Sequence, residues 1–236
     1  MYRYLFFDAD GTLFDFNEAE SRAFHQMAAK LGFSASPKQL QTYKVCNEAC
    51  WRAFERSELT QATLKVKRFE DFFTSEALSL DATLASRIYQ SYLSGQGILY
   101  KESLPLLDAL IEGGYTLYLA SNGIAEVQRG RLKQSDTLRY FKDIFISEEI
   151  GAQKPAREFF SAMLGRTGLE EKKSECLMIG DSLTSDIQGG ATYGLDTIWL
   201  NQDGTHKNNT SVQPTYEVHS LSEILSLLSN VCSLHS

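Results

Sequence analysis

The first apolar run of the chain, residues 4–7, is separated from the next strand-like run, at residues 115–120, by a long stretch of sequence. It is followed by a short acidic segment and then, over residues 16–97, by a long stretch with helical periodicity and few strand signals. From Ser103 onward, helices alternate with short apolar runs, which is the pattern of β-α units that build a parallel sheet. The pattern predicts an α/β fold with a parallel sheet. The sheet would take its first strand from the N-terminus and the others from the second half, with a helical block inserted between them.

Later apolar runs predict the remaining strands. Because open α/β sheets keep their ligand crevice at the carboxyl ends of the strands, polar residues that follow these runs are candidates for a site. We expect strands at residues 115–120, 144–147, 176–179 and 197–200, helices at 104–112 and 221–228, and a surface loop at 201–214.

The inserted block carries several signals for helix starts. Asn17, with Glu20 three residues later, resembles a capping box and predicts a helix over residues 18–31. Further starts are indicated at Ser36-Pro37, Thr60 and Asp81.

Length and composition fit one large domain with a moderate insertion. The chain has 236 residues, of which 43% are hydrophobic, as in a folded globular protein. We expect a core domain formed by residues 1–15 and 98–236 and a helical domain formed by residues 16–97.

The charge balance argues against nucleic acid polymers and membranes as partners. The chain has 23 basic and 30 acidic residues, a net charge of -7, and no basic stripe. No basic segment followed by an apolar stretch opens the chain, and no apolar run is long enough to span a bilayer. We therefore expect a cytoplasmic protein, a monomer or small homo-oligomer, that acts on a small molecule.

Four polar segments follow predicted strands or lie on nearby turns. Alone, each would be interpreted as a helix cap, a turn or a solvated side chain. Together they supply carboxylates, a hydroxyl group, backbone donors and a cation, which are the groups that phosphoryl transfer requires. The segments are Asp8 to Asp10, Ser121-Asn122-Gly123, Lys154-Pro155 and Asp181 to Asp186.

The acidic residues can divide the chemistry among them. Asp8 can attack phosphorus if a cation offsets the repulsion between two anions. Because Mg²⁺ prefers hard oxygen ligands, Asp8 and Asp181 can share one with a main-chain carbonyl, and Asp186 can orient a metal-bound water. Asp10 can protonate the leaving oxygen and then activate the water that breaks an aspartyl-phosphate. The candidate metal ligands are Asp8, Asp10, Asp181 and Asp186.

The other two segments can stabilise the transferred group. Lys154 supplies a fixed positive charge, and the Ser121 hydroxyl with nearby backbone N–H groups can hold the phosphoryl oxygens. Asn122 and Gly123, on the same turn as Ser121, are candidate substrate-binding residues.

In order and content, these four segments resemble the motifs of the haloacid dehalogenase superfamily. All four are intact, and serine at position 121 keeps the hydroxyl donor. The resemblance covers essentially the whole core and implies a Rossmann-like parallel sheet, with the helical block in the position of a cap domain. It also implies that Asp8 is the nucleophile, Asp10 the general acid and base, and Asp181 a magnesium ligand.

Within that superfamily, the acid at position 10 favours a phosphatase. Dehalogenases of the superfamily do not protonate a leaving alkoxide and lack this acid. A phosphomutase resembling β-phosphoglucomutase would share the core motifs, and a non-catalytic module that binds a phosphorylated metabolite is an alternative of another class. A phosphonatase would need a cap lysine, for which the candidates are Lys30, Lys38, Lys44, Lys65 and Lys67.

Several segments resemble the YjjG-type 5'-nucleotidases, which dephosphorylate nucleoside monophosphates, particularly pyrimidine ones. In the block, Asn47, Trp51 and Arg68 are residue types that can hydrogen-bond to a base or stack on it, although bundle packing and ion pairing are the alternative interpretation. We expect a magnesium-dependent 5'-nucleotidase, with sugar phosphates or phosphoglycolate as alternative substrates. The resembling segments are Tyr43 to Asn47, Lys67 to Phe69, Ile146 to Gly151 and Trp199 to Asn201.

Overall fold

A computed structural model describes residues 1–204 and 211–233 of the chain. By its internal contacts the chain separates into two compact units, which we call the α/β unit and the helical unit. Residues 126–134 group with the helical unit, although they follow a strand of the α/β unit in the sequence. The domain boundaries expected from the sequence stay a proposal. The α/β unit consists of residues 1–15, 99–125 and 135–236, and the helical unit of residues 16–98 and 126–134.

A six-stranded parallel sheet forms the centre of the α/β unit. Its strands are β1 (Tyr4–Phe7), β2 (Thr116–Ser121), β3 (Phe141–Ile146), β4 (Cys176–Gly180), β5 (Asp196–Leu200) and β6 (Tyr216–Val218). Their order in the sheet is β3-β2-β1-β4-β5-β6, and each neighbouring pair is parallel. The N-terminal strand thus pairs with two strands from the second half of the chain, which confirms the predicted α/β fold with a helical insertion.

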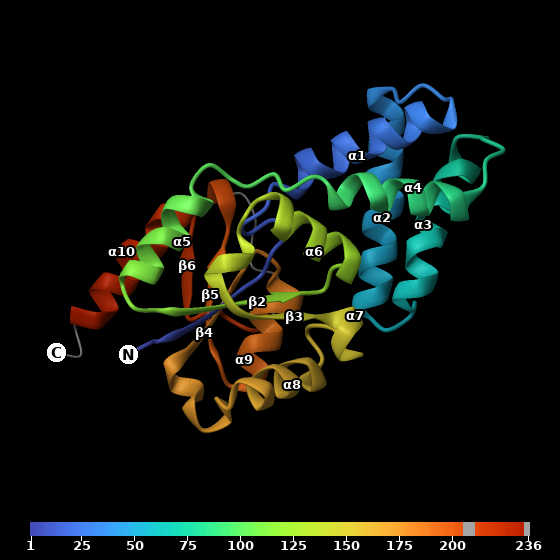
Figure 1. The fold of residues 1–236 in the computed structure, drawn as a ribbon. Helices are drawn as coiled ribbons and strands as arrows, with labels where there is room; N and C mark the ends of the chain where they lie inside the picture. Colours follow the sequence, from blue (N-terminus) through green and yellow to red (C-terminus); the bar gives the residue numbers. More distant parts are fainter. Residues whose placement is uncertain (205–210, 234–236) are drawn as a thin grey trace. The chain divides into compact units, whose positions relative to one another are not determined.

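Helices cover both faces of the sheet (Figure 1). One face carries α5 (Ser103–Glu112) and α10 (Leu221–Ser233), and the other carries α8 (Arg157–Thr167) and α9 (Gly189–Tyr193). Below the sheet, the buried side chains of Phe6, Tyr118 and Met178 pack with Phe160 of α8, and the rings of Phe6 and Tyr118 stack at 4.7 Å. Alternate residues of these strands therefore build an apolar layer between the sheet and α8.

The sheet differs from the prediction at its edges. The strand predicted at 144–147 begins at Phe141, and Ser147 starts the short helix α7 (Ser147–Ile150). Strand β6 was not predicted, because it has three residues of which one is buried. The predicted loop at 201–214 contains a 3-10 turn over Gln202–Gly204, and its residues 205–210 lie outside the described part of the chain.

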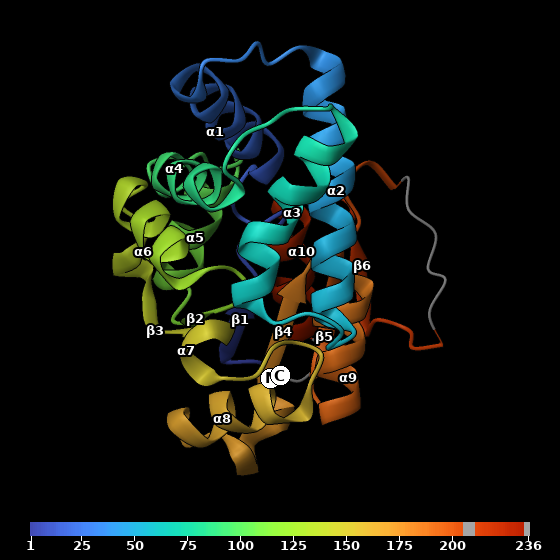
Figure 2. The ribbon, with the colours of Figure 1, turned by 90° about the vertical axis from the view of Figure 1, so that its right-hand side faces the viewer.

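The helical unit is a bundle around an aromatic core. It contains α1 (Phe16–Leu31), α2 (Pro37–Glu55), α3 (Gln61–Ser75) and α4 (Ala82–Ser94). Helices α2 and α3 run side by side (Figure 2), and α1 and α3 pack against α4. The ring of Tyr43 stacks on Phe24 at 4.8 Å and on Phe69 at 5.3 Å. Among the described residues, no helix combines the length and apolar character needed to cross a membrane.

Helix α6 (Ala125–Gln134) joins this bundle from a distant part of the chain. The Nε of Arg131 donates a hydrogen bond to the Gln96 carbonyl at 3.2 Å. A Cβ atom added at Gly130 would lie 2.8 Å from Ser94, so the absence of a side chain there allows α6 to approach the end of α4 closely.

The predicted helix starts were confirmed in three of four places. Ser36 and Gln39 form a capping box at the start of α2, and Thr60 and Asp81 cap α3 and α4. The capping box predicted at Asn17 and Glu20 was wrong, because α1 begins at Phe16 and includes both residues. Glu20 is instead buried and accepts a hydrogen bond from Asn47 at 2.7 Å.

Candidate active site

Three carboxylates meet at the carboxyl edge of the central strands. Asp8 directly follows β1, and its N–H continues the ladder by donating to the Ile179 carbonyl of β4 at 2.8 Å. Asp181 directly follows β4, so the pairing of β1 with β4 brings the two residues together. Oxygen atoms of Asp8, Asp181 and Asp186 all lie within 4.8 Å of one another. The fold thus brings residues far apart in sequence into one acidic cluster.

Lys154 is the cation of this cluster. Its Nζ donates to Asp8 Oδ1 at 2.7 Å, to Asp186 Oδ1 at 2.6 Å and to the Ala120 carbonyl at 2.5 Å. Burial alone would lower the pKa of Lys154, but the charges of Asp186 and Asp8 outweigh this effect and raise it above its ordinary value. The ammonium group is therefore charged at neutral pH and held by three acceptors.

One lysine does not neutralise the whole cluster. Burial raises the pKa of Asp8 to about 7, against the opposing charge of Lys154, and the negative charge of Asp186 adds to the increase. The pKa of Asp181 is also raised well above its ordinary value. Desolvation of its carboxylate is the largest cause, and the charges of Asp8 and Asp186 add to it, although part of the residue is exposed to solvent. Hard oxygen donors with excess negative charge fit a divalent cation such as Mg²⁺.

The three carboxylates differ in how free they are to bind a metal. Asp186 is fully buried, and the protein engages both of its oxygens, since Oδ1 accepts from Lys154 and Oδ2 accepts from the Ser182 N–H at 3.1 Å. It lies in the middle of a π-helical turn over Leu183–Gln188. Asp8 and Asp181 would hold the cation, and Asp186 would hold Lys154 and the Ser182 backbone in place beside them.

Asp10, the fourth predicted ligand, is placed differently. Its carboxylate is not part of the cluster formed by the other three acids. Its backbone forms an isolated bridge with Phe14, and the Gly11 N–H donates to the Phe14 carbonyl at 3.0 Å. Asp10 therefore stands on a tight turn, half-buried and two residues from Asp8.

The same turn carries contacts that the sequence did not reveal. Thr12 is completely buried, and its Oγ1 lies 3.5 Å from Asp8 Oδ2 and 3.5 Å from Asp181 Oδ1. Gly11 has φ of +84°, and a Cβ atom there would lie 2.3 Å from Asp181 Oδ2. The Asp-Gly-Thr sequence was the available signal, since glycine permits the left-handed backbone and the close approach.

Of the residues predicted to hold the phosphoryl oxygens or bind substrate, Asn122 contacts the backbone of Lys154. The Asn122 side chain bonds the Lys154 backbone on both sides, donating Nδ2 to its carbonyl and accepting its N–H, each at 2.8 Å. The Ser121 Oγ is buried and accepts a hydrogen bond from the Gly123 N–H at 3.0 Å. Asn122 thus positions the lysine, and contact of Ser121, Asn122 or Gly123 with substrate stays a prediction.

The predicted base-binding residues lie in the helical unit. Asn47 and Arg68 are buried there and joined, with Arg68 Nη1 donating to Asn47 Oδ1 at 3.1 Å. The Arg68 guanidinium also lies 4.8 Å from the ring centre of Tyr89. Trp51 is separate from this network and partly exposed, and it packs edge-on against Phe54 at 5.7 Å. Their contact with substrate also stays a prediction.

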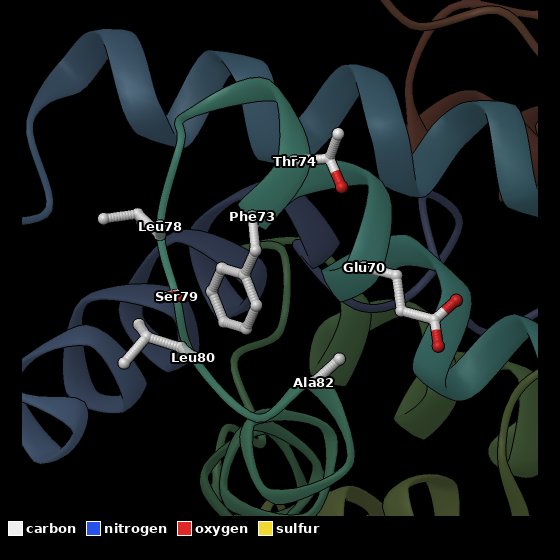
Figure 3. A pocket seen from close by; sticks show the side chains of 7 residues that line it. All are labelled: Glu70, Phe73, Thr74, Leu78, Ser79, Leu80 and Ala82. Atoms are coloured by element: carbon white, nitrogen blue, oxygen red, sulfur yellow. The ribbon is translucent and has the colours of Figure 1, made fainter.

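The helical unit also contains a pocket of about 520 Å³ at the end of α3 and the start of α4 (Figure 3). Phe73 projects toward the loop that carries Leu78 and Leu80, and Glu70 is the charged residue of the lining. No residue predicted from the sequence to bind or react lines this pocket. The acidic cluster is therefore the better candidate active site.

Comparison with known proteins gives concordant matches. The model of the haloacid dehalogenase-like hydrolase family matches residues 2–194. Pyrimidine 5'-nucleotidase PynA of Streptococcus pneumoniae is 40% identical over 227 residues, covering 96% of this chain and 95% of the relative. Pyrimidine 5'-nucleotidase YjjG of Escherichia coli is 30% identical over 226 residues, covering 95% and 97%.

A solved structure matches over nearly the full length. The crystal structure of the HAD-hydrolase YfnB of Bacillus subtilis, bound to magnesium, has a TM-score of 0.90 and 34% sequence identity, with coverage of 96% of this chain and 98% of that one.

Proposed function

The chain belongs to the haloacid dehalogenase-like hydrolases, and from that premise we propose that it is a magnesium-dependent phosphatase that hydrolyses nucleoside 5'-monophosphates. The observation that carries the reaction class is the buried contact of Lys154 with Asp8, at the edge of an acidic cluster that fits a divalent cation. A carboxylate held beside a fixed cation and a metal site can attack a phosphate monoester despite its negative charge.

Asp8 is the nucleophile of the proposed reaction. One of its carboxylate oxygens attacks phosphorus in line, the ester oxygen leaves, and an aspartyl-phosphate forms. Magnesium bound at this cluster would supply positive charge against the repulsion between carboxylate and phosphate. Lys154 adds a second positive charge, which its contacts with Asp8, Asp186 and the Ala120 carbonyl hold in place.

Asp10 is the general acid and then the general base of the proposed reaction. In the first step its carboxyl group gives a proton to the leaving 5'-oxygen of the nucleoside. In the second step the same carboxylate takes a proton from the water that attacks the aspartyl-phosphate, which releases phosphate and regenerates Asp8. A position outside the metal cluster suits this role, because a directly bound cation would hinder protonation of Asp10.

The substrate class is supported by the relatives. The two pyrimidine 5'-nucleotidases match almost the whole chain, including the helical unit in which Asn47, Trp51 and Arg68 lie. We propose these three residues, as the sequence predicted, as the candidates for base recognition.

A substrate panel tests this function. Phosphate release is measured with pyrimidine and purine monophosphates, sugar phosphates and phosphoglycolate, with magnesium and then with excess chelator. We expect the highest kcat/KM for a pyrimidine monophosphate, by at least about 10-fold over any sugar phosphate, and loss of turnover in chelator. Undiminished turnover in chelator would refute the metal role, and a preference for a sugar phosphate would refute the substrate class.

The alternatives predict other results in the same assay. A phosphomutase would return the phosphoryl group to an organic acceptor rather than release phosphate. A non-catalytic binding module would bind the substrates but turn over none of them.

A further inference from the structure

We infer that Trp199 and Gln202, at the end of β5, are positioning residues that hold the two acidic turns in register for magnesium. This inference rests on the proposed metal site, and it concerns how the protein keeps that site in shape.

Trp199 contacts the turn after β4. It is the partner of Gly180 in the pairing of β4 with β5, and 2% of its surface is exposed. Its indole Nε1 donates a hydrogen bond to the main-chain carbonyl of Asp181 at 2.9 Å. A side chain thus holds the backbone of a candidate metal ligand one residue beyond the end of the strand.

Gln202 contacts the other acidic turn. Its Nε2 donates to the Gly11 carbonyl at 3.0 Å, between Asp10 and Thr12. Gly11 in turn lies so close to the Asp181 carboxylate that a Cβ atom would collide with it. The two donors come from one short segment and reach both turns that carry the acids.

The Asp181 side chain is weakly held by comparison. Lys154 contacts Asp8 and Asp186 directly, whereas Asp181 Oδ1 accepts a long hydrogen bond from Thr12 Oγ1, at 3.5 Å. The charges of Asp8 and Asp186 repel the Asp181 carboxylate, so its backbone must be fixed if the ligand oxygen is to stay in place. Partners that orient a metal ligand in this way commonly contribute about 10-fold or more to metal affinity.

The test measures magnesium binding by calorimetry, independently of turnover. Trp199→Phe keeps the aromatic packing and removes the N–H, and we expect it to raise the Kd for magnesium about 10-fold. Gln202→Met keeps the chain length and removes the donor, and we expect a smaller increase of several-fold. Trp51→Phe, which changes the only other tryptophan of the sequence, is the matched control and should leave the Kd unchanged.

A second measurement covers the case in which Trp199→Phe does not fold. In the Trp51→Phe protein, Trp199 gives a single ¹⁵N-indole resonance in an NMR spectrum. We expect that resonance to shift as magnesium is added and to remain slow in hydrogen exchange.

The outcomes separate this inference from the proposed function. If the unaltered chain binds magnesium and neither Trp199→Phe nor Gln202→Met changes the Kd, the positioning role is overturned and the phosphatase stands. An indole resonance that does not respond to saturating magnesium would overturn it equally. If the unaltered chain binds no magnesium, both proposals fail.

Discussion

Lys154 Nζ lies 2.7 Å from Asp8 Oδ1, at a place where 1% of the lysine side chain is exposed. The same nitrogen contacts Asp186, whose side chain is completely buried. A cation removed from water in this way depends on its acidic partners, and they depend on it.

Lys154→Met should therefore impair both activity and stability. Removal of the fixed charge is expected to lower kcat by about 100-fold or more. Asp8 and Asp186 would be left without their cation, which should lower the free energy of unfolding by about 3 kcal/mol or more in chelator. Phosphate release and urea unfolding measure the two effects. Lys142→Met, at an exposed lysine of the same unit, is the control and should change neither.

Asp10→Asn should separate the two proposed chemical steps. With p-nitrophenyl phosphate, whose leaving group needs little protonation, we expect a rapid burst of about one p-nitrophenol per enzyme, followed by turnover slowed by roughly 100-fold or more. The burst would report an aspartyl-phosphate that lacks a base for hydrolysis. Asp8→Asn should give neither burst nor turnover, and a burst from that variant would contradict Asp8 as the nucleophile.

The raised pKa of Asp8 predicts a pH dependence of stability in the metal-free protein. Burial raises this pKa from 3.8 to about 7, so folding favours the protonated form. The contribution of Asp8 to the free energy of unfolding is then fully present below about pH 3.8 and is lost as the pH rises through about 7. Denaturant unfolding in chelator should show this decline, and Asp8→Asn should reduce its slope. If the free energy of unfolding changes between about pH 3.8 and pH 7 by the same amount in the unaltered protein and in Asp8→Asn, the prediction is contradicted.

Gly11→Ala should damage the metal site beyond its backbone strain. Gly11 and Gly114 have similar φ, +84° and +79°. A Cβ at Gly11 would lie 2.3 Å from Asp181 Oδ2, whereas a Cβ at Gly114 would lie in open space beyond its own chain neighbours. Both alanine variants should lose about 1 kcal/mol of stability from the left-handed backbone. Only Gly11→Ala should also weaken magnesium binding, as measured by calorimetry. Equal magnesium affinity in the two variants would argue against the contact with Asp181.

In the helical unit, Arg68 and Trp51 should respond differently to substitution. Arg68 is buried and joined through Asn47 to Glu20, so Arg68→Met is expected to lower the free energy of unfolding by about 2 kcal/mol or more.

Trp51 is partly exposed, and Trp51→Ala should raise KM for a nucleoside monophosphate more than KM for a non-aromatic phosphomonoester. Equal changes in the two KM values would remove Trp51 as a base-stacking residue.

The sheet could be predicted because its central strands are short, continuous apolar runs. Residues 5–7 and Cys176–Gly180 are buried, and runs of this length that end in polar turn residues are typical of the central strands of a parallel sheet. Strand β6 lies at the edge of the sheet and has three residues, of which one is buried, so its sequence shows neither an apolar run nor a clear alternation of apolar and polar residues. Short edge strands acquire their structure from the neighbouring strand rather than from their own sequence.

The acidic residues of the site could also be predicted, but their supporting contacts could not. Asp8 and Asp181 are marked by their positions after apolar runs. The hydrogen bonds from Trp199 to Asp181 and from Asn122 to Lys154 join residues 18 and 32 positions apart, and their partners follow from the register of the strands. The false capping box has the same cause, because the partner of Glu20 is 27 positions away on another helix.

The position of helix α6 affects how chimeras of such proteins should be designed. Its contacts with Ser94 and Gln96 make the helical unit a product of two chain segments, residues 16–98 and 126–134. A chimera that transplants the first segment alone would pair one protein's bundle with another's α6, and Gly130 would no longer be matched to the helix it meets. The two segments should therefore be grafted together, as one block.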